Sequence, residues 1–322
     1  MSLRIAVLGA GGHSRVSHGA ALKIWAAEHP GEIELAAVCD LDRDKATAYA
    51  RDFGFAAAYA DLEGMLDAEE LDGLIAVTPV ERTFPLVGKL LQRGIPLVIE
   101  KPPGETVEHT RQLLALARRQ GTPHMISFNR RFHPGLLIAR QWLGEHAADS
   151  PPRLSLTRML RVARREENFA FWTGIHCIDA TLSLMGAPAH AAARHVASPI
   201  PDRPAYVARL DLENGAAASF LLAPDTGCMQ ETYELFGHDY RIFLDFWPCA
   251  VTIHRSGETV LEWHAPEDAP AAYRDGSVGE TDAFGRSLQG RRVWSPSLEE
   301  GLTAMRAAET VERGWERELE TE

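Results

Sequence analysis

The chain has 322 residues, 45% of them hydrophobic and 24% charged, which is the composition of a globular protein with about two domains. Its 33 basic and 45 acidic residues give a formal net charge of −12, which argues against a protein that coats nucleic acid or anionic lipid. No stretch has the length of a membrane span or the pattern of a signal peptide, so we expect a cytoplasmic protein. The four cysteines are scattered and form no C-x-x-C pair, so neither a metal site nor a disulfide framework is expected.

The first third of the chain alternates short apolar runs with longer amphipathic segments. The apolar runs predict strands over Leu3–Leu8, Glu34–Asp40, Leu74–Val77, Leu97–Ile99 and His124–Phe128. Apolar residues at helical spacing predict helices over Arg15–Glu28, Arg43–Phe53, Phe84–Arg93 and Val107–Gln120. Strands that alternate with helices predict a parallel sheet with crossover helices, an α/β domain.

After a transitional stretch over residues 129–152 the pattern changes to strands that follow one another directly. They are predicted over Arg153–Val162, Tyr206–Leu212, Ala216–Leu222, Glu231–Gly237, Tyr240–Phe246, Val251–His254 and Thr259–His264. Asn214-Gly215 predicts a two-residue type I′ hairpin between two of them. Helices over Ile175–Met185 and Leu298–Arg313 complete an α+β domain with an antiparallel sheet, and the acidic end Glu316–Glu322 is expected to fray.

A glycine-rich loop lies between the first predicted strand and the first helix. Gly9, Gly11 and Gly12 let the backbone turn and let its N–H groups approach a pyrophosphate at the start of a helix. His13 and Ser14 complete the loop, and Ser14 replaces the third glycine of G-x-G-x-x-G, where it adds bulk between helix and strand or caps the helix. The loop predicts a dinucleotide site, with a plain glycine turn as the alternative.

Asp40 ends the second predicted strand. A carboxylate at this place accepts hydrogen bonds from an adenosine ribose and repels a 2′-phosphate, which favours NAD over NADP. Two alternatives stay open. Asp40 caps the following helix, or Arg43 accepts a 2′-phosphate, which keeps NADP possible.

Two pairs of residues that include polar side chains follow the next strands of the predicted parallel sheet. Thr78-Pro79 comes after Leu74–Val77, and Glu100-Lys101 comes after Leu97–Ile99. Ligands bind at the carboxyl ends of strands in such sheets. A Glu-Lys pair braced by two prolines predicts a rigid site that holds an amine toward a ligand. The alternative is that Lys101 only pairs with Glu100 or another acid.

These pieces, in this order, resemble the glucose–fructose oxidoreductase/inositol dehydrogenase (Gfo/Idh/MocA) family over nearly the whole chain. The resemblance continues in Asn129-Arg130-Arg131-Phe132 and in Gly174-Ile175-His176-x-x-Asp179. It implies a doubly wound Rossmann domain (residues 1–125) that binds NAD(H) or NADP(H). A second domain (residues 126–322) is implied to carry an open, mainly antiparallel sheet, to hold the substrate and to mediate a homodimer or homotetramer. The implied substrates are sugars, cyclitols and related polyols, and no nucleic acid or membrane is an expected partner.

The resemblance also implies roles for individual residues. Lys101 matches the lysine that contacts the reacting hydroxyl or carbonyl and the nicotinamide, and His176 matches the proton donor and acceptor, with a core histidine as the alternative. Asp179 lies one helical turn from His176 and is expected to orient the imidazole, with a helix-surface acid as the alternative. The cofactor site is expected to comprise Gly9, Gly11, Gly12, His13, Ser14, Asp40, Thr78, Pro79, Glu100, Lys101 and Asn129.

One position departs from the family pattern. Many members carry an aspartate four residues before the histidine, and this chain has Trp172 there, which cannot transfer that proton. The proton relay is then reduced to Lys101 and His176, or the protein binds cofactor with little dehydrogenase activity, as a sensor or interaction partner. We place Trp172 against the substrate, and a core position is the alternative.

Arginines gather in the transitional stretch and the strand that follows it. Arg130 and Arg158 are assigned to the substrate site together with Lys101, Trp172 and His176. On a strand, Arg158 and Arg164 share one face, and Arg161 and Arg165 share the other. Such a face suits a carboxylated or phosphorylated substrate. The alternative is a solvated edge or a subunit contact.

Overall fold

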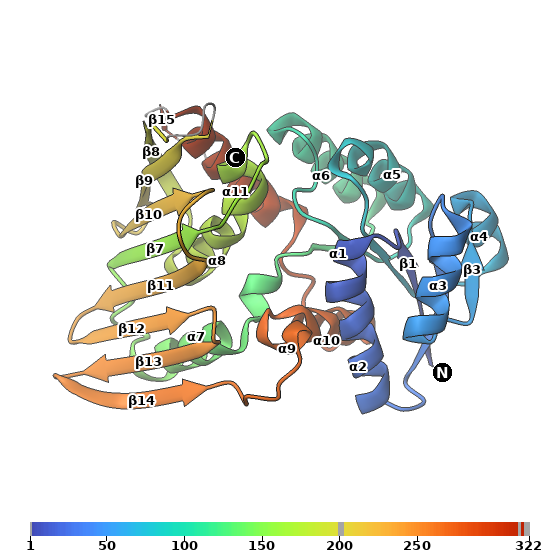
Figure 1. Ribbon diagram of the computed structural model, residues 1–322, viewed down its shortest axis with the longest axis horizontal. Helices are drawn as coiled ribbons and strands as arrows, with labels where there is room; N and C mark the ends of the chain where they lie inside the picture. Colours follow the sequence, from blue (N-terminus) through green and yellow to red (C-terminus); the bar gives the residue numbers. More distant parts are fainter. Residues whose placement is uncertain (1, 199–202, 315–316, 319–322) are drawn as a thin grey trace. The chain divides into compact units, whose positions relative to one another are not determined.

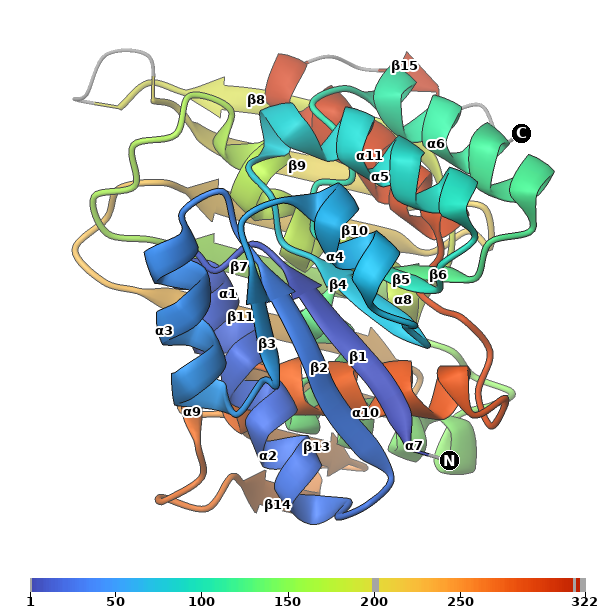
Figure 2. The same cartoon turned by 90° about the vertical axis from the view of Figure 1, so that its right-hand side faces the viewer.

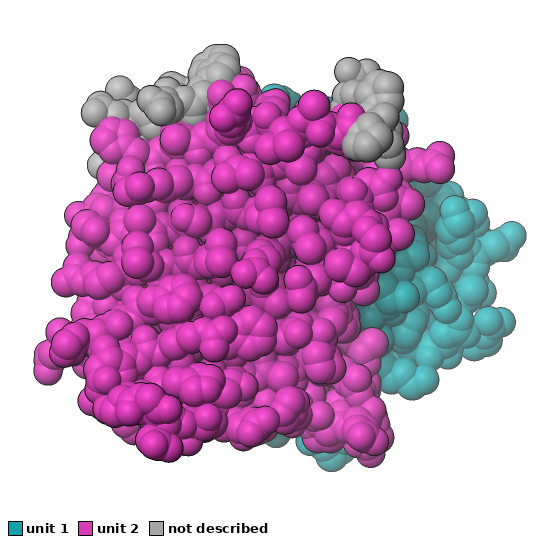
Figure 3. Space-filling view, turned by 60° about the vertical axis from the view of Figure 1, so that its left-hand side comes forward, with its two compact units in different colours: residues 1–128, 276–302 teal, residues 129–275, 303–322 magenta. Residues whose placement is uncertain are grey.

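The computed structural model describes residues 2–198, 203–314 and 317–318. The chain forms two compact units, which Figure 3 shows in different colours. The first unit comprises Met1–Phe128 and Gly276–Leu302, and the second comprises Asn129–Asp275 and Thr303–Glu322. Figure 1 traces both units and carries the element labels used below.

The first unit holds a six-stranded parallel sheet in the order β3-β2-β1-β4-β5-β6. Its strands are β1 (Leu3–Leu8), β2 (Ile33–Cys39), β3 (Ala57–Tyr59), β4 (Gly73–Ala76), β5 (Leu97–Ile99) and β6 (His124–Ile126). Its helical segments are α1 (Gly12–Ser14), the π-helical η1 (Arg15–Gly19), α2 (Ala20–Glu28), α3 (Arg43–Phe53), α4 (Leu62–Ala68), α5 (Val80–Arg93), α6 (Val107–Gln120) and α10 (Ser277–Leu288). The strand order reverses at β1, so α2 and α3 cover one face and α5 and α6 the other (Figure 2). The predicted doubly wound Rossmann sheet is confirmed.

The segment Gly276–Leu302 belongs to the first unit, so the division differs from the single predicted boundary between residues 125 and 126. Two hydrogen bonds attach this segment to the end of β6: the Ile126 N–H donates to the Pro296 carbonyl at 2.7 Å, and the Ser127 hydroxyl donates to Glu280 at 2.9 Å. Gly285 of α10 lies against the indole of Trp25 in α2, where a Cβ would come within 2.0 Å of the ring. Glycine at this position therefore permits the close packing of α10 on α2.

The second unit holds a nine-stranded sheet in the order β14-β13-β12-β11-β7-β10-β9-β8-β15. Its strands are β7 (Leu154–Leu160), β8 (Pro188–Val196), β9 (Ala205–Leu212), β10 (Ala217–Ala223), β11 (Gln230–Gly237), β12 (Tyr240–Asp245), β13 (Ala250–Arg255), β14 (Glu258–His264) and β15 (Arg317–Glu318). All neighbours are antiparallel except β7 and β10, so the predicted mainly antiparallel sheet is confirmed. Of the acidic end predicted to fray, only β15 lies within the described residues.

Helices accompany this sheet. They are the 3₁₀ turn η2 (Asn129–Phe132), α7 (Pro134–His146), the π-helical η3 (Ala170–Gly174), α8 (Ile175–Met185), α9 (Ala271–Arg274) and α11 (Leu298–Arg313), the last of which spans the boundary between the units. Helix α7 packs against β12 and β13, and α8 packs against β7 (Figure 1). Among the described residues, no helix is long and apolar enough to cross a membrane.

The turn between β9 and β10 differs from the prediction. A type I′ turn needs positive φ at both central residues, but only Gly215 has it (φ +78°), and Asn214 does not. The Gly215 N–H donates to the Leu212 carbonyl, and the Leu212 N–H donates to the Ala216 carbonyl. These bonds describe a longer loop in which glycine takes the left-handed position after the turn. The hairpin prediction is therefore right and its turn type wrong.

His133 is a buried histidine in the second unit. Its ring is fully buried and stacks on Phe246 with ring centroids 4.5 Å apart. Nε2 lies 3.3 Å from the Phe246 carbonyl, while Nδ1 has no hydrogen-bond partner within the described part of the chain. Burial lowers the pKa of His133 from 6.5 to about 4.

This pKa predicts a loss of stability in acid. Between the ordinary and the lowered pKa the unfolded chain binds a proton that the folded protein excludes, so acidification favours unfolding. From pH 7 to pH 5, His133 should reduce the free energy of unfolding by about 2 kcal/mol. Urea unfolding at both pH values should show that His133→Gln loses less stability than the wild type by this amount. Equal losses in the two proteins would contradict the assignment.

Candidate active site

The glycine loop has the geometry of a phosphate cradle. Gly9 has φ +103°, and a Cβ there would fall 1.9 Å from the Val77 carbonyl oxygen, so only glycine fits. Gly11 and Gly12 have open space where a side chain would be, and the helical segment begins at Gly12. The loop therefore presents an open helix start without side chains, which fits a dinucleotide pyrophosphate.

Ser14 packs against Tyr49 of α3. It is fully buried, and its hydroxyl donates to the Tyr49 hydroxyl at 3.0 Å, while the Tyr49 hydroxyl donates to the Ser14 carbonyl at 3.2 Å. Its side chain makes no helix-capping bond. Of the two roles expected for Ser14, the structure shows the packing role.

Asp40 lies beside the glycine loop. One carboxylate oxygen accepts the Ala10 N–H at 2.8 Å, and the other accepts the Asp42 N–H at 2.9 Å. The N-terminal cap of α3 is Asp42, whose side chain accepts backbone N–H groups of α3, so the alternative that Asp40 caps this helix is wrong. A carboxylate held next to the loop at the end of β2 fits the ribose of NAD.

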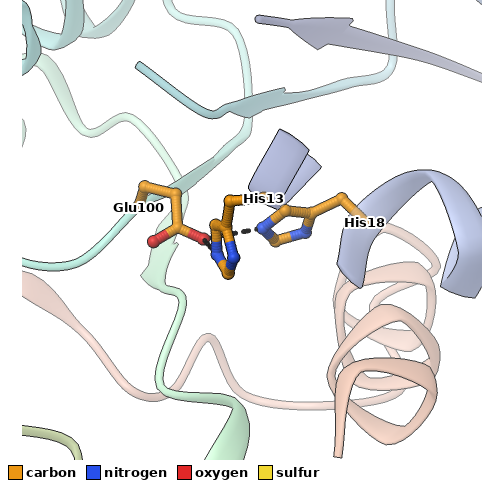
Figure 4. A group of neighbouring side chains, drawn as sticks. All are labelled: His13, His18 and Glu100. Carbon is orange, nitrogen blue, oxygen red and sulfur yellow. Dashed lines mark hydrogen bonds and ion pairs between the residues drawn. The ribbon is translucent and has the colours of Figure 1, made fainter. Parts of the chain in front are cut away.

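Glu100 and two histidines form a cluster at the ends of β5 and the first helix (Figure 4). The Nε2 atoms of His13 and His18 lie 2.9 and 2.8 Å from the same oxygen, Oε1 of Glu100. The other oxygen, Oε2, accepts the Lys101 N–H at 2.9 Å. Burial opposes ionisation of Glu100, but the two imidazoles hold its pKa well below the usual value. His18 was not predicted, and its sole signal in the sequence is that it is a second histidine five residues after His13.

Lys101 and Thr78 follow β5 and β4 at the predicted edge of the sheet. Lys101 is half-buried and directly follows the buried Glu100. Thr78 shares a hydrogen bond with the Thr83 hydroxyl at 3.0 Å, and Pro79 caps the start of α5. The Glu100 carboxylate holds the backbone N–H of Lys101, and the role of the Lys101 amine stays a prediction.

The remaining predicted residues belong to the second unit. The Asn129 amide donates to the Asp275 carbonyl at 2.9 Å and accepts from Arg130 at 3.0 Å. The Arg130 guanidinium lies 4.7 Å from the centre of the Phe246 ring and 3.3 Å from Glu231. The proposed contacts of Asn129 with the cofactor and of Arg130 with the substrate stay predictions.

Glu231 is the centre of a buried charge network. It is fully buried, accepts from Arg161 and accepts the Tyr233 hydroxyl at 2.6 Å. Burial alone would raise its pKa, but Arg130 and Arg161 lower it to about 2. The carboxylate is therefore ionised and paired, and its role is to neutralise two guanidinium groups inside the unit.

The prediction that four other arginines lie on the two faces of one strand is wrong. Strand β7 ends at Leu160, so Arg161, Arg164 and Arg165 lie beyond the strand and share no strand face with Arg158. The Arg158 guanidinium lies 3.7 Å from Glu234, and Arg164 pairs with Glu166 at 2.7 Å. Carboxylates of the chain thus lie near both groups, and the carboxylated or phosphorylated substrate stays a prediction.

His176 and Asp179 lie one turn apart on α8, as predicted. His176 is 8% exposed and Asp179 is 1% exposed, so the alternative of a helix-surface acid is wrong. Both Asp179 oxygens accept from Arg131, at 2.7 and 2.8 Å, in a bidentate pair between α8 and η2. This partner was not foreseen, and the orienting role of Asp179 stays a prediction. Trp172 is half-buried in η3, just before α8.

Comparison with known proteins identifies the first unit. Residues 3–128 match the family model described as "Oxidoreductase family, NAD-binding Rossmann fold". The Rossmann unit of this chain thus matches the Gfo/Idh/MocA oxidoreductase family. The family model describes an NAD-binding domain, which agrees with the glycine loop and Asp40.

Curated relatives match part of the chain. D-apiose dehydrogenase of Paraburkholderia graminis is 30% identical over 162 residues, which cover 48% of this chain and 43% of the relative. D-glucoside 3-dehydrogenase of Escherichia coli is 28% identical over 204 residues, which cover 58% of this chain and 55% of the relative. The chain thus spans about half the length of these relatives.

Solved structures match the whole chain. An NAD-binding oxidoreductase from Klebsiella pneumoniae has a TM-score of 0.86 at 17% identity and covers 100% of both chains. Levoglucosan dehydrogenase in complex with NADH has a TM-score of 0.83 at 17% identity, covering 98% of this chain and 97% of that one. At these identities the likeness shows the fold alone, and it extends over both units.

Proposed function

We propose that this protein is an NAD-dependent dehydrogenase or reductase that acts on a CH–OH group of a sugar, a cyclitol or a related polyol. The observation that carries the proposal is the arrangement at the edge of the Rossmann sheet. An open glycine loop after β1, Asp40 beside it and Lys101 after β5 lie at the strand ends where such sheets bind a dinucleotide. The names of the relatives, which are sugar and inositol dehydrogenases, support the substrate class.

The mechanism needs two polar groups besides the cofactor. NAD, when bound, supplies hydride exchange at C4 of its nicotinamide. Lys101 holds its ammonium toward the reacting oxygen and stabilises the negative charge that develops there. His176 takes the hydroxyl proton during oxidation and returns it during reduction. Arg131 fixes Asp179, and the helix that carries both Asp179 and His176 is thereby tied to η2.

Trp172 supports a second candidate function. An indole cannot exchange the proton that an aspartate exchanges, so this chain is alternatively a cofactor-binding protein with little dehydrogenase activity. A panel of sugars, cyclitols, amino-sugar acids and their keto forms, assayed for NADH production or consumption, separates the two. Turnover of one compound supports the dehydrogenase. Tight NADH binding without turnover across the panel supports the sensor or interaction protein.

Asp40 should set the choice of cofactor. Wild-type protein should bind NADH more tightly than NADPH, because the carboxylate repels a 2′-phosphate. Asp40→Ala should weaken NADH binding about tenfold, which is the effect of losing one charged hydrogen bond. It should also reduce the difference between the affinities for NADH and NADPH. Energy transfer from the tryptophans to the reduced nicotinamide measures both affinities. Asp42→Ala, in the neighbouring helix cap, is the matched control, and an equal loss there would contradict the assignment.

We also propose a cytoplasmic homodimer or homotetramer. The outward face of the second sheet carries Leu154, Val207 and Leu221, which are 56%, 51% and 36% exposed, and Val207 faces Leu221 across β9 and β10. Such a face suits association with a second copy. All four cysteines are free thiols, which fits a reducing compartment. Light scattering gives the copy number, and a monomer would refute the oligomer.

A further inference from the structure

Three side chains with metal-binding atoms converge in the first unit, and the proposed mechanism leaves their arrangement unexplained. His13, His18 and Glu100 place one ligand atom each within 4.8 Å of one another (Figure 4). The carboxylate and the His18 imidazole are 7% and 3% exposed, and the His13 imidazole is 54% exposed. Two of the three ligands are therefore buried, and the exposed His13 leaves a path by which an ion can enter the site.

The π-helical turn brings the two histidines together. In a regular α-helix, residues five positions apart point about 140° away from each other. Here the Ala20 N–H donates to the Arg15 carbonyl, five residues back, which inserts one extra residue into the turn. His13 and His18 are then related nearly as residues four apart, on one side of the helix. The T-shaped contact of their rings, with centroids 5.9 Å apart, agrees with this.

We propose that His13, His18 and Glu100 form a binding site for one divalent transition metal ion, of which Zn²⁺ is the best match. The ligands are the two Nε2 atoms and Oε1 of Glu100. Two imidazoles and one carboxylate form an N₂O set, which suits zinc and leaves a fourth position open. The site goes beyond the dehydrogenase activity and does not depend on it.

Two of the three distances between ligand atoms are already close to those around a bound zinc ion, and the two nitrogens lie within 4.8 Å of each other. Zinc bonds of about 2.0 to 2.2 Å at tetrahedral angles place neighbouring ligand atoms about 3.3 Å apart. The two nitrogens lie 2.9 and 2.8 Å from the carboxylate oxygen. Each needs an outward shift of about 0.5 Å, within reach of a side-chain rotation. The second oxygen of Glu100 accepts the Lys101 N–H, which orients the carboxylate.

The first test is metal binding by the full chain without a histidine tag and without NAD. Equilibrium dialysis should find one Zn²⁺ per chain, and Co²⁺ should give the visible absorption of a tetrahedral site. His18→Ala and Glu100→Gln should each weaken Zn²⁺ binding by about 100-fold or more, because a ligand is lost. His29→Ala, at the C-terminal cap of α2, should bind Zn²⁺ as the wild type does. No stoichiometric ion, or wild-type affinity in His18→Ala with its fold intact by circular dichroism, would overturn the proposal.

A second variant covers the case in which the buried substitutions prevent folding. His13 is the exposed ligand, so His13→Cys should fold and supply a thiolate in place of the imidazole. The Co²⁺ complex should then gain a thiolate-to-cobalt charge-transfer band that neither the wild type nor a His29→Cys control shows. Absence of this band would remove His13 from the site. Because no cofactor or substrate is present, failure of the metal site would leave the dehydrogenase proposal intact.

Discussion

Lys101→Ala is expected to lower kcat on the compound found in the substrate panel by about 100- to 1,000-fold, the usual effect of removing one group that stabilises a developing oxyanion. The ammonium acts on the transition state more than on the bound substrate, so kcat should fall more than KM rises. NADH affinity, measured by energy transfer, should change little. Lys101→Arg keeps the charge but changes its shape and position, and should recover only part of the activity.

His176→Ala should have a comparable effect on kcat, because the hydroxyl proton then has no side chain to accept it. His176→Gln keeps a polar side chain of similar size but cannot exchange the proton, so it should be nearly as inactive. His190→Ala, on β8, is the matched control for a histidine outside the proposed site. Full activity in Lys101→Ala or in His176→Ala would contradict the catalytic assignment.

Arg131→Met should reduce the free energy of unfolding by about 3 to 5 kcal/mol, the usual result of breaking a buried ion pair from one side. Asp179 is 1% exposed and has both oxygens bound by the guanidinium, so the variant leaves a carboxylate buried without its counter-ion. Asp179→Leu should reduce the free energy of unfolding by a similar amount, because it leaves the buried Arg131 guanidinium without its counter-ion. Urea unfolding measures both changes.

The double variant Arg131→Met/Asp179→Leu separates the ion pair from the packing around it. It removes both charges together and should recover most of the lost stability, since apolar replacements of a buried pair are often neutral. Arg209→Met, in an exposed pair with Asp211, should change stability by less than about 0.5 kcal/mol. Additive losses in the double variant would mean that the pair contributes little and that the side chains act through their volume.

The Rossmann elements were predictable because each one is encoded locally. Strands such as β1 and β5 are bounded apolar runs whose central residues are fully buried, and helices such as α3 and α6 end at Gly54 and Gly121 in the left-handed conformation. The missed elements lack that encoding. Strand β3 is three half-buried residues, and β8 carries two histidines and an arginine, so neither shows alternation.

The residues of the site also divide into those that the sequence predicts and those that it does not. Gly9, Asp40 and Lys101 stand next to strand ends, so a sequence pattern can find them. His18 was missed because its partner, Glu100, lies 82 positions away, and because the π turn that exposes it to Glu100 has no known sequence signal. Glu231 was missed for a similar reason. Its partners Arg130 and Arg161 come from other segments, and an isolated glutamate on a strand indicates a surface residue.

The most direct test of the proposed chemistry is isotope transfer from NADH that carries deuterium at C4 of its nicotinamide. The protein is incubated with this cofactor and the keto compounds of the panel, and the products are analysed by mass spectrometry. Hydride transfer predicts a product with deuterium on the new carbinol carbon, and the label should be lost from the cofactor in equal amount. If NADH binds but deuterium reaches no compound of the panel, the dehydrogenase account is contradicted, and the cofactor-binding function replaces it.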